Sequence, residues 1–181
     1  WQINSWKDEG FRAASVDDKG DFFKETINKI YAEYEAVCLR DNLVDFGELL
    51  LRSYEVVRDN PSVRTFFHSR FKSILVDEFQ DTNTIQYNWL LEIASDQASI
   101  TAVGDDDQSI YGWRGAKVEN VESFTKTFDD TEIIRLEQNY RSTNIILGAA
   151  NALIENNTDR LGKNLWTCLL YTSDAADEGL G

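Results

Sequence analysis

Two short apolar runs, each ending directly in acidic residues, constrain the fold of this chain more than any other feature. Ser73–Val76 (Ser-Ile-Leu-Val) is followed by Asp77 and Glu78, and residues 100–103 (Ile-Thr-Ala-Val) are followed by Gly-Asp-Asp-Asp. Such runs are typical of buried strands that stop at the edge of a sheet. Because ligands bind beyond the carboxyl ends of parallel strands, both acidic clusters mark a candidate site.

Helical periodicity fills most of the remaining chain, which contains one proline in 181 residues. Apolar residues that recur every three or four positions predict helices over 21–37, 45–57, 60–71, 85–93, 118–128 and 142–154. Asp21, Asp45 and Asn60 are candidate N-caps, and Glu48 stands at capping-box spacing from Asp45. With a third short strand expected at Ile133–Ile134, strands alternate with helices, which predicts an α/β fold with parallel strands. The second helix is expected to bury Phe46, Leu49, Leu50 and Val57.

Composition limits the classes of protein to which the chain can belong. The 18 Lys and Arg residues against 32 Asp and Glu residues give a net charge of −14, and 42% of the residues are hydrophobic, which indicates a folded acidic protein. Cys38, Cys168 and His68 are too few for a disulfide framework or a Cys/His zinc cluster. No apolar run approaches the ~18 residues of a membrane span and no signal peptide is present, so we expect a cytoplasmic protein without a membrane partner. The chain lacks methionine, and we expect it to be a fragment of a longer protein.

The acidic pair after the first apolar run has the residue types needed for metal-assisted hydrolysis. Asp77 could hold a divalent cation through its carboxylate, and Glu78 could orient or deprotonate an attacking water. An Asp-Glu pair after an apolar run is more often an exposed turn. The dipeptide by itself therefore leaves both interpretations open.

The loop at residues 104–116 carries an amide, two large aromatic residues and an arginine between glycines. Tyr111, Trp113 and Arg114 are suited to stacking on unpaired bases and pairing with phosphate, as in proteins that bind single-stranded nucleic acid. The aromatic residues could instead fill a hydrophobic gap. Gln108 could contact a phosphate oxygen through its amide, or it could simply be solvated.

A third polar motif occupies residues 135–143, where the last expected strand turns into a helix. Tyr140 could stack on a planar base while Arg141 reaches a phosphate and stabilises charge in a transition state. The structural alternative is that Arg141 pairs with Glu137 or Asp129.

Three segments taken in chain order resemble the motifs of superfamily 1 DNA helicases of the UvrD/PcrA/Rep group: Ile74–Asn83, Val103–Ala116 and Arg135–Thr143. Further segments are most similar to the UvrD branch of that group, and the resemblance ends near Thr167. These are Trp1-Gln2-Ile3-Asn4-Ser5, Lys7-Asp8-Glu9-Gly10, Leu43-Val44-Asp45-Phe46, Asn151–Asn156 and Arg160-Leu161-Gly162-Lys163.

The resemblance implies that the candidate residues serve ATP hydrolysis with Mg²⁺. Asp77 is expected to bind the metal ion, and Glu78 to activate the attacking water. Gln108 is expected to sense the terminal phosphate. Tyr140 is expected to stack on adenine while Arg141 reaches the γ-phosphate.

The resemblance also implies a DNA contact and a domain organisation. Single-stranded DNA is expected to contact Tyr111, Trp113 and Arg114. The fold implied is a partial RecA-like P-loop NTPase lobe with parallel strands, preceded by part of a helical insert and followed by the start of a second lobe. The expected ranges are 1–43 for the end of the helical insert, 44–137 for the latter half of the first lobe, 138–167 for the start of the second, and 168–181 for a tail outside the family pattern.

The function implied is that of a fragment of an ATP-dependent 3′–5′ DNA helicase, which couples hydrolysis to movement on single strands and unwinding at duplex junctions during repair. DNA-repair proteins are candidate partners. The chain contains no Gly-x-x-x-x-Gly-Lys-Ser/Thr loop, so the fragment alone is expected to be inactive. One alternative is an acidic module that binds a protein partner. The other is a metal-dependent nuclease that uses Asp77, Glu78, Asp81 and Asp105 around two cations.

Overall fold

The two predicted strands pair with each other in a computed structural model that describes residues 1–112, 115–117, 119–156 and 162–169. β1 (Ser73–Val76) and β2 (Ser99–Ala102) form a two-stranded parallel sheet in which Ser73 faces Ser99 and Val76 faces Ala102. The mixed α/β class and the parallel pairing are therefore confirmed. Burial alternates along both strands, and Leu75 is 71% exposed, so the prediction that these strands are buried is wrong.

The chain divides into two compact units, Trp1–Thr127 and Phe128–Gly181. The helices of the first unit are α1 (Gln2–Asp8), α2 (Phe22–Arg40), α3 (Phe46–Asp59), α4 (Pro61–Arg70), α5 (Thr84–Ile93) and α6 (Glu119–Thr127). The second unit contains α7 (Asn144–Ile154). Short 3₁₀ turns lie at η1 (Ala13–Ser15), η2 (Phe79–Asp81) and η3 (Asp106–Gln108). No helix among the described residues is both long and apolar enough to cross a membrane.

Side-chain caps explain where several helices begin. The Asp21 carboxylate accepts hydrogen bonds from the first-turn amides of α2, and the Asp45 carboxylate accepts one from the Glu48 amide in α3. Both predicted caps are confirmed. Asn60 precedes Pro61 as expected, but its side chain donates to the Val56 carbonyl and does not cap α4. Each cap satisfies backbone donors that the helix itself leaves unpaired.

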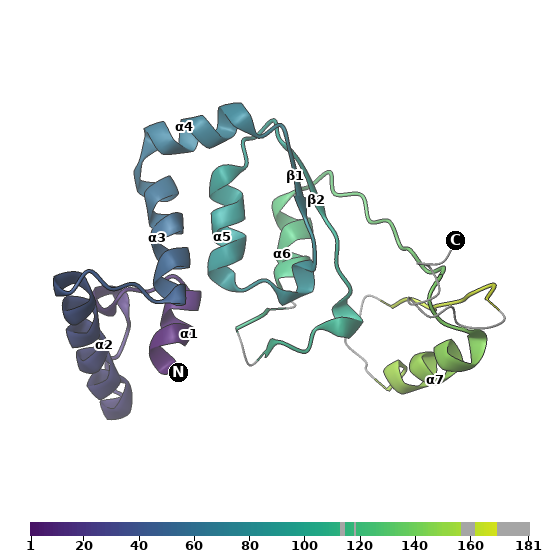
Figure 1. The fold of residues 1–181 in the computed structure, drawn as a ribbon, viewed down its shortest axis with the longest axis horizontal. Coiled ribbons are helices and arrows are strands. Elements are labelled where there is room, and N and C mark those ends of the chain that lie inside the picture. The colour runs from purple at the N-terminus through teal and green to yellow at the C-terminus, as the bar shows by residue number, and fades with distance from the viewer. Residues whose placement is uncertain (113–114, 118, 157–161, 170–181) are drawn as a thin grey trace, which may run out of the picture. The chain divides into compact units, whose positions relative to one another are not determined.

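The core of the first unit lies between the sheet and the helices that flank it. Figure 1 shows α5 between α3 and the strands. Phe79, only 3% exposed, follows β1 and contacts Tyr87 of α5 and Phe124 of α6 edge to face, with ring centroids 6.0 and 5.4 Å away. Leu51 and Ile85 are fully buried in the same unit. This packing fixes the segment that leaves β1, where the acidic pair lies.

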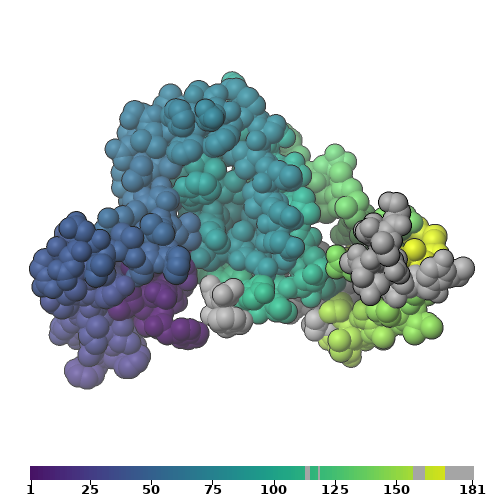
Figure 2. Space-filling view, in the orientation of Figure 1, coloured from purple at the N-terminus to yellow at the C-terminus, as the bar shows by residue number. Residues whose placement is uncertain are grey.

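Helix α1 was missed by the sequence analysis, although it anchors the start of the chain. Its Trp6 is buried and stacks on Tyr31 of α2 at a centroid distance of 6.0 Å. Helix α1 packs against both α2 and α3, and the purple and dark-blue atoms of the N-terminal part lie together in the space-filling view (Figure 2). At seven residues α1 is too short to show a helical period, so only its tertiary contacts identify it.

Two further expectations are wrong. Phe46 is 92% and Leu49 52% exposed, because α3 packs against α1 and α5 through the face that carries Leu51 and Val57. Ile133–Ile134 does not form a strand. Pairing in this part of the described chain is instead an isolated parallel bridge between Gln138 and Trp166.

Candidate functional site

The segments that leave β1 and β2 stay side by side beyond the strands. The Val103 amide donates to the Val76 carbonyl at 2.8 Å, and the Phe79 amide donates to the Val103 carbonyl at 2.9 Å. These bonds hold the two segments together where they leave the strands. As a result the Asp77-Glu78 pair and the 104–108 loop lie at one sheet edge, as the sequence predicted.

Glu78 adopts an unusual backbone conformation at this edge. Its φ of 51° and ψ of 44° lie in the left-handed region, which costs a residue with a Cβ about 1 kcal/mol. The Asp77 carboxylate accepts a hydrogen bond from the Glu78 amide at 3.0 Å, and both residues are exposed. Non-glycine residues held in this region cluster at functional sites, where neighbouring contacts fix them.

Gln80 joins the two acidic segments. Its side-chain Nε2 donates to Glu78 Oε2 at 2.7 Å, and its Oε1 accepts from the Asp105 amide at 2.9 Å. The residue is 1% exposed. A Cβ at Gly104 would lie 2.7 Å from Gln80 Oε1, so glycine is needed for the β2 loop to approach this side chain.

Asp105 continues the connection towards the predicted phosphate sensor. One of its carboxylate oxygens accepts from the Asp107 amide at 3.1 Å and caps η3. The other accepts from Gln108 Nε2 at 2.6 Å. A series of hydrogen bonds therefore runs from Glu78 through Gln80 and Asp105 to the exposed Gln108.

Carboxylates suited to a cation are also found here, though not in the predicted grouping. Asp105, Asp106 and Asp107 place carboxylate oxygens within 4.8 Å of one another. Among the described residues, Asp77 and Asp81 belong to no such group of three. The four acids of the nuclease alternative are therefore not gathered around a common point, and that alternative loses its support.

Tyr140 and Arg141 belong to the second unit and are positioned by Asn139. The Asn139 side-chain oxygen accepts hydrogen bonds from the amides of Arg141 at 2.9 Å and Ser142 at 2.7 Å. The Asn139 amide donates to the Trp166 carbonyl at 2.8 Å, which secures the turn before α7. Tyr140 is 74% exposed and Arg141 is also exposed, so both are open to a ligand.

The predicted DNA contacts are only partly described. Tyr111 is half-buried, and its carbonyl accepts from the Ala116 amide at 3.3 Å, which closes the loop on itself. Trp113 and Arg114 lie outside the described residues.

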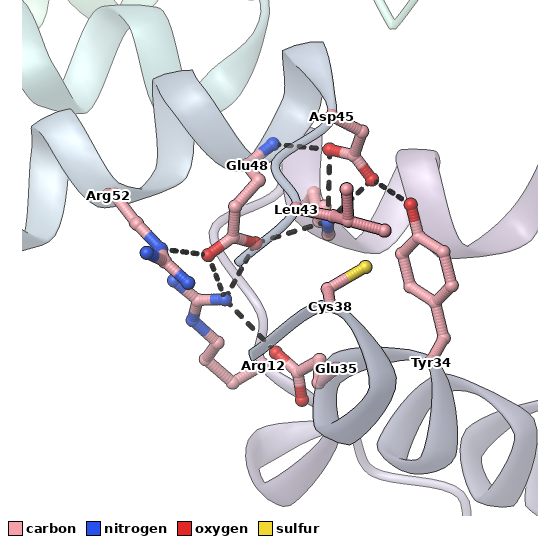
Figure 3. A pocket seen from close by; sticks show the side chains of 9 residues that line it. Arg12, Tyr34, Glu35, Cys38, Leu43, Asp45, Glu48 and Arg52 are labelled. Carbon is pink, nitrogen blue, oxygen red and sulfur yellow. Dashed lines mark hydrogen bonds and ion pairs between the residues drawn. The ribbon is translucent and has the colours of Figure 1, made fainter. Parts of the chain in front are cut away.

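A second polar cluster, the charged junction, lies where α1, α2 and α3 meet (Figure 3). Lys7, 2% exposed, places Nζ 2.8 Å from Asp45 and 3.1 Å from Glu48. Arg12 Nη1 donates to both Glu48 oxygens at 2.8 Å, and Arg52 also pairs with Glu48. Glu35 and Glu55 complete the junction by accepting from Arg12. The cavity beside it measures about 30 Å³, which is too small for a nucleotide.

Within the charged junction, hydrogen bonds favour the ionised forms of Glu48 and Asp45. Burial alone raises the pKa of Glu48, but hydrogen bonds from Arg52, Arg12 and Lys7 outweigh it and hold that pKa below the ordinary value. Burial likewise raises the pKa of Asp45, and hydrogen bonds from Lys7 and Tyr34 reverse the effect. The Tyr34 hydroxyl donates to Asp45 at 2.6 Å, and this hydrogen bond raises the pKa of Tyr34. This cluster therefore acts as an ionic cross-link between helices.

Comparison with known proteins places the chain in a family. Residues 1–129 match the model of the UvrD/REP helicase N-terminal domain, which is well over half of the chain. The chain belongs to the UvrD/REP helicase family. It is 56% identical to DNA helicase II of Escherichia coli (strain K12) over 167 residues, which cover 92% of this chain and 23% of that relative.

Two other relatives are also DNA helicases. DNA helicase II of Haemophilus influenzae is 54% identical over 167 residues, 92% of this chain and 23% of the relative. ATP-dependent DNA helicase PcrA of Bacillus subtilis is 42% identical over 148 residues, 82% of this chain and 20% of the relative. The chain thus spans about a quarter or less of these curated relatives.

Sequence reasoning in this UvrD/REP family member missed Gln80, Gly104 and Asn139. Gln80 stands two residues after Glu78, and a polar residue between acidic neighbours in the sequence gave no sign that it would be buried. Gly104 could have been noticed as a glycine directly after a strand, where a close backbone approach is common. Asn139 carried a usable local signal, because asparagine often accepts from the amides that follow it in a turn.

Proposed function

We propose that this chain is part of an ATP-dependent DNA helicase in which ATP hydrolysis drives movement along single-stranded DNA and unwinding of duplex junctions. The intact protein moves in the 3′–5′ direction and serves DNA repair, together with repair proteins. The membership of the UvrD/REP helicase family supports the general activity. The hydrogen bonds that connect Glu78 to Gln108 are the structural observation on which the motor interpretation depends.

The roles at the sheet edge follow from the chemistry of each side chain. Glu78 orients and deprotonates the attacking water, since a carboxylate at an exposed strand end can accept its proton. Gln108 contacts the terminal phosphate through its amide. Asp77, exposed at the end of β1, supplies oxygen ligands of the type that Mg²⁺ takes, and Asp105 to Asp107 offer more of them at the same sheet edge. The metal ion, when bound, neutralises phosphate charge.

The second unit supplies the base and phosphate contacts. Tyr140 stacks on adenine, for which its exposed ring is suited, and Arg141 stabilises charge on the γ-phosphate. Tyr111, Trp113 and Arg114 contact single-stranded DNA by stacking and phosphate pairing. Because Gln108 and Tyr111 are three residues apart in one loop, the state of the phosphate can alter the grip on DNA.

The proposed architecture places these residues in two RecA-like lobes. Residues 44–137 form the latter half of the first lobe, after a helical insert that ends near residue 43. Residues 138–167 begin the second lobe, and 168–181 form a tail outside the family pattern. Since the 181 residues contain no Gly-x-x-x-x-Gly-Lys-Ser/Thr sequence, the isolated segment does not hydrolyse ATP.

A hybrid helicase tests the proposal. In this hybrid, the segment replaces the matching 167 residues of Escherichia coli DNA helicase II. We expect the hybrid to unwind a duplex with a 3′ single-stranded tail when ATP and Mg²⁺ are present. Glu78→Gln should retain ATP binding and lose at least ~100-fold in turnover, because the amide cannot accept the proton.

Two outcomes would contradict the proposal. An unmutated hybrid that folds but neither hydrolyses ATP nor unwinds DNA would show that this segment cannot serve the motor. Near-normal turnover in Glu78→Gln would remove Glu78 from its role. Cleavage of DNA by the 181-residue chain with Mg²⁺ alone would revive the nuclease alternative.

A further inference from the structure

We propose that Lys117 is a further contact to the phosphates of single-stranded DNA, and that Glu9 of α1 competes with the DNA for its ammonium group. This role rests on the proposed function, because the loop at residues 104–116 must lie against single-stranded DNA. Lys117 directly follows that loop, and the sequence analysis assigned it no role.

The backbone of Lys117 is fixed beside the proposed DNA contact Tyr111. The Ala116 amide donates to the Tyr111 carbonyl at 3.3 Å, so Lys117 stands one residue beyond this closure of the loop. The Lys117 amide donates to the Thr82 carbonyl at 3.0 Å, and the Lys117 carbonyl accepts from the Asn120 amide at 3.0 Å. Because both backbone groups are held, the side chain leaves the chain from a fixed point at the base of the loop.

The carboxyl end of α1 lies against the same part of the loop. A Cβ at Gly115 would lie 3.3 Å from Asp8 Oδ2, and Asp8 Oδ1 accepts a hydrogen bond from Asn83 Nδ2 at 2.9 Å. Glu9 follows Asp8 and faces Lys117. Two carboxylates therefore lie at the base of the loop, where they would repel a phosphate unless a cation offsets them.

Lys117 supplies a cation at this point, and Glu9 holds it only loosely. The Lys117 Nζ lies 3.9 Å from Glu9 Oε1, which is longer than a hydrogen bond. The side chains of Lys117 and Glu9 are 44% and 40% exposed, so water screens the pair. Within the described part of the chain, no other acid lies at ion-pair distance from Lys117. The ammonium group can therefore turn away from Glu9 at little cost.

A DNA phosphate can hold the ammonium group more firmly than Glu9 does. A lysine that neutralises a phosphate releases condensed counterions, which adds about −0.7 to the slope of log affinity against log salt for a single strand. Relative to 1 M salt, this release strengthens binding by ~8-fold at 50 mM and ~3-fold at 200 mM for one contact. The Glu9 carboxylate has no such counterion atmosphere, so DNA displaces it at low salt.

The first test measures the affinity of the hybrid helicase for fluorescein-labelled oligothymidylate by anisotropy, without ATP, between about 50 and 200 mM NaCl. Lys117→Met keeps most of the side-chain length and removes the charge. We expect binding to weaken by ~8-fold at 50 mM and ~3-fold at 200 mM, so that the salt slope becomes less steep by ~0.7.

Lys126→Met is the matched control for the loss of one charge. Lys126 is 71% exposed and pairs with Glu122 at 2.7 Å within α6, so the substitution changes the net charge equally without touching the loop. It should leave the DNA affinity and the salt slope of the hybrid unchanged. If Lys117→Met and Lys126→Met have the same salt slope, Lys117 does not contact phosphate and the proposal is overturned.

Glu9→Gln distinguishes competition from a purely structural ion pair. If the pair only supported the fold, loss of either partner would weaken DNA binding. If Glu9 competes with DNA, Glu9→Gln should tighten binding about twofold at ~50 mM salt, because an exposed pair is weak. In a Lys117→Met background, Glu9→Gln should have no effect. Tightening that persists without Lys117 would show that Glu9 only repels DNA, and the competition would be overturned.

Lysine footprinting tests the contact without an affinity measurement. Acetylation of the hybrid, followed by mass spectrometry, should be ~10-fold slower at Lys117 when oligothymidylate is present at about ten times its Kd, because only about a tenth of the molecules are then free. Lys126 should react at the same rate with and without DNA. Equal acetylation of Lys117 in both conditions would overturn the contact.

The outcomes separate the Lys117 contact from the helicase function. Because binding is measured without ATP, a hybrid that binds oligothymidylate but neither hydrolyses ATP nor unwinds DNA would refute the motor, while the Lys117 variants would still decide the contact. An active hybrid whose Lys117→Met variant keeps the full salt slope would overturn the contact alone. A folded hybrid that binds no oligothymidylate would overturn both.

Discussion

Replacement of Glu48 by glutamine tests whether the charged junction holds α1, α2 and α3 together. Glu48 is 4% exposed. Its carboxylate accepts two hydrogen bonds from Arg12, each of 2.8 Å, and one from Arg52. It also forms an ion pair with Lys7 at 3.1 Å. Glutamine keeps the shape but turns an NH₂ group towards these cations. Lys7 still has Asp45, and Arg52 is half-exposed and can turn to solvent. We therefore expect a loss of about 3 kcal/mol, the lower end of the cost of breaking a buried ion pair.

Urea unfolding of the 181-residue chain, followed by far-ultraviolet circular dichroism at pH 7, measures this loss. The control is Glu25→Gln, which removes an exposed pair with Lys29 one turn away on α2. It should leave the unfolding free energy nearly unchanged, because solvent screens an exposed ion pair. If Glu48→Gln costs under about 1 kcal/mol, the junction does not cross-link the helices and the argument is wrong.

A comparison of the unmodified chain with Glu48→Gln over a range of pH gives a second test of the charged junction. The folded pKa of Glu48 lies below its ordinary value of 4.5, so folding favours the ionised carboxylate. This contribution is fully present above pH ~4.5 and is lost as pH falls through the folded pKa. The difference in unfolding free energy between the unmodified chain and Glu48→Gln should therefore shrink below pH ~4.5. A difference that grows as the pH falls would contradict the assignment.

Three further changes have defined outcomes. Gly104→Ala should lower the free energy of unfolding in urea by about 2 kcal/mol, because the added Cβ would lie 2.7 Å from Gln80 Oε1. Gly148→Ala in α7 should raise it by about 0.5 kcal/mol, because a Cβ there meets nothing within 4 Å and alanine favours the helix. Asn42 has a φ of 54°, so Asn42→Val should lower the free energy of unfolding by about 1–2 kcal/mol and Asn42→Gly should change it little, as measured by thermal unfolding. In the hybrid helicase, Trp113→Ala should weaken DNA-stimulated ATPase more than basal ATPase; equal losses would indicate a core residue.

Local sequence predicted the features that depend on local chemistry. The apolar runs predicted the bounds of β1 and β2 to within one residue. Asp21 and Asp45 cap α2 and α3, as their positions before the helical patterns indicated. The strand predicted at Ile133–Ile134 is absent, although a pair of β-branched residues favours extended backbone. A strand also needs hydrogen bonds to a neighbouring strand, and the local sequence does not reveal these.

The site was harder to predict because its key contacts are not local. The acidic clusters could be placed at one edge from strand ends alone. The hydrogen bond from the Asp105 amide to Gln80 spans 25 residues and exists only after β1 and β2 have paired. Glu48 shows the same limit. Its spacing predicted a capping box, but its side chain pairs with Lys7 and Arg12 of earlier segments and with Arg52 one turn along α3, and it does not bond to the Asp45 amide.

The charged junction has a consequence for how this protein can be divided or recombined. Lys7 and Arg12 precede the proposed boundary near residue 43, and Asp45, Glu48 and Glu55 follow it. A chimera cut at that boundary would inherit cations from one parent and their carboxylates from another. The helical insert is therefore not a portable module by itself, and crossover points that respect the ionic partners must fall elsewhere.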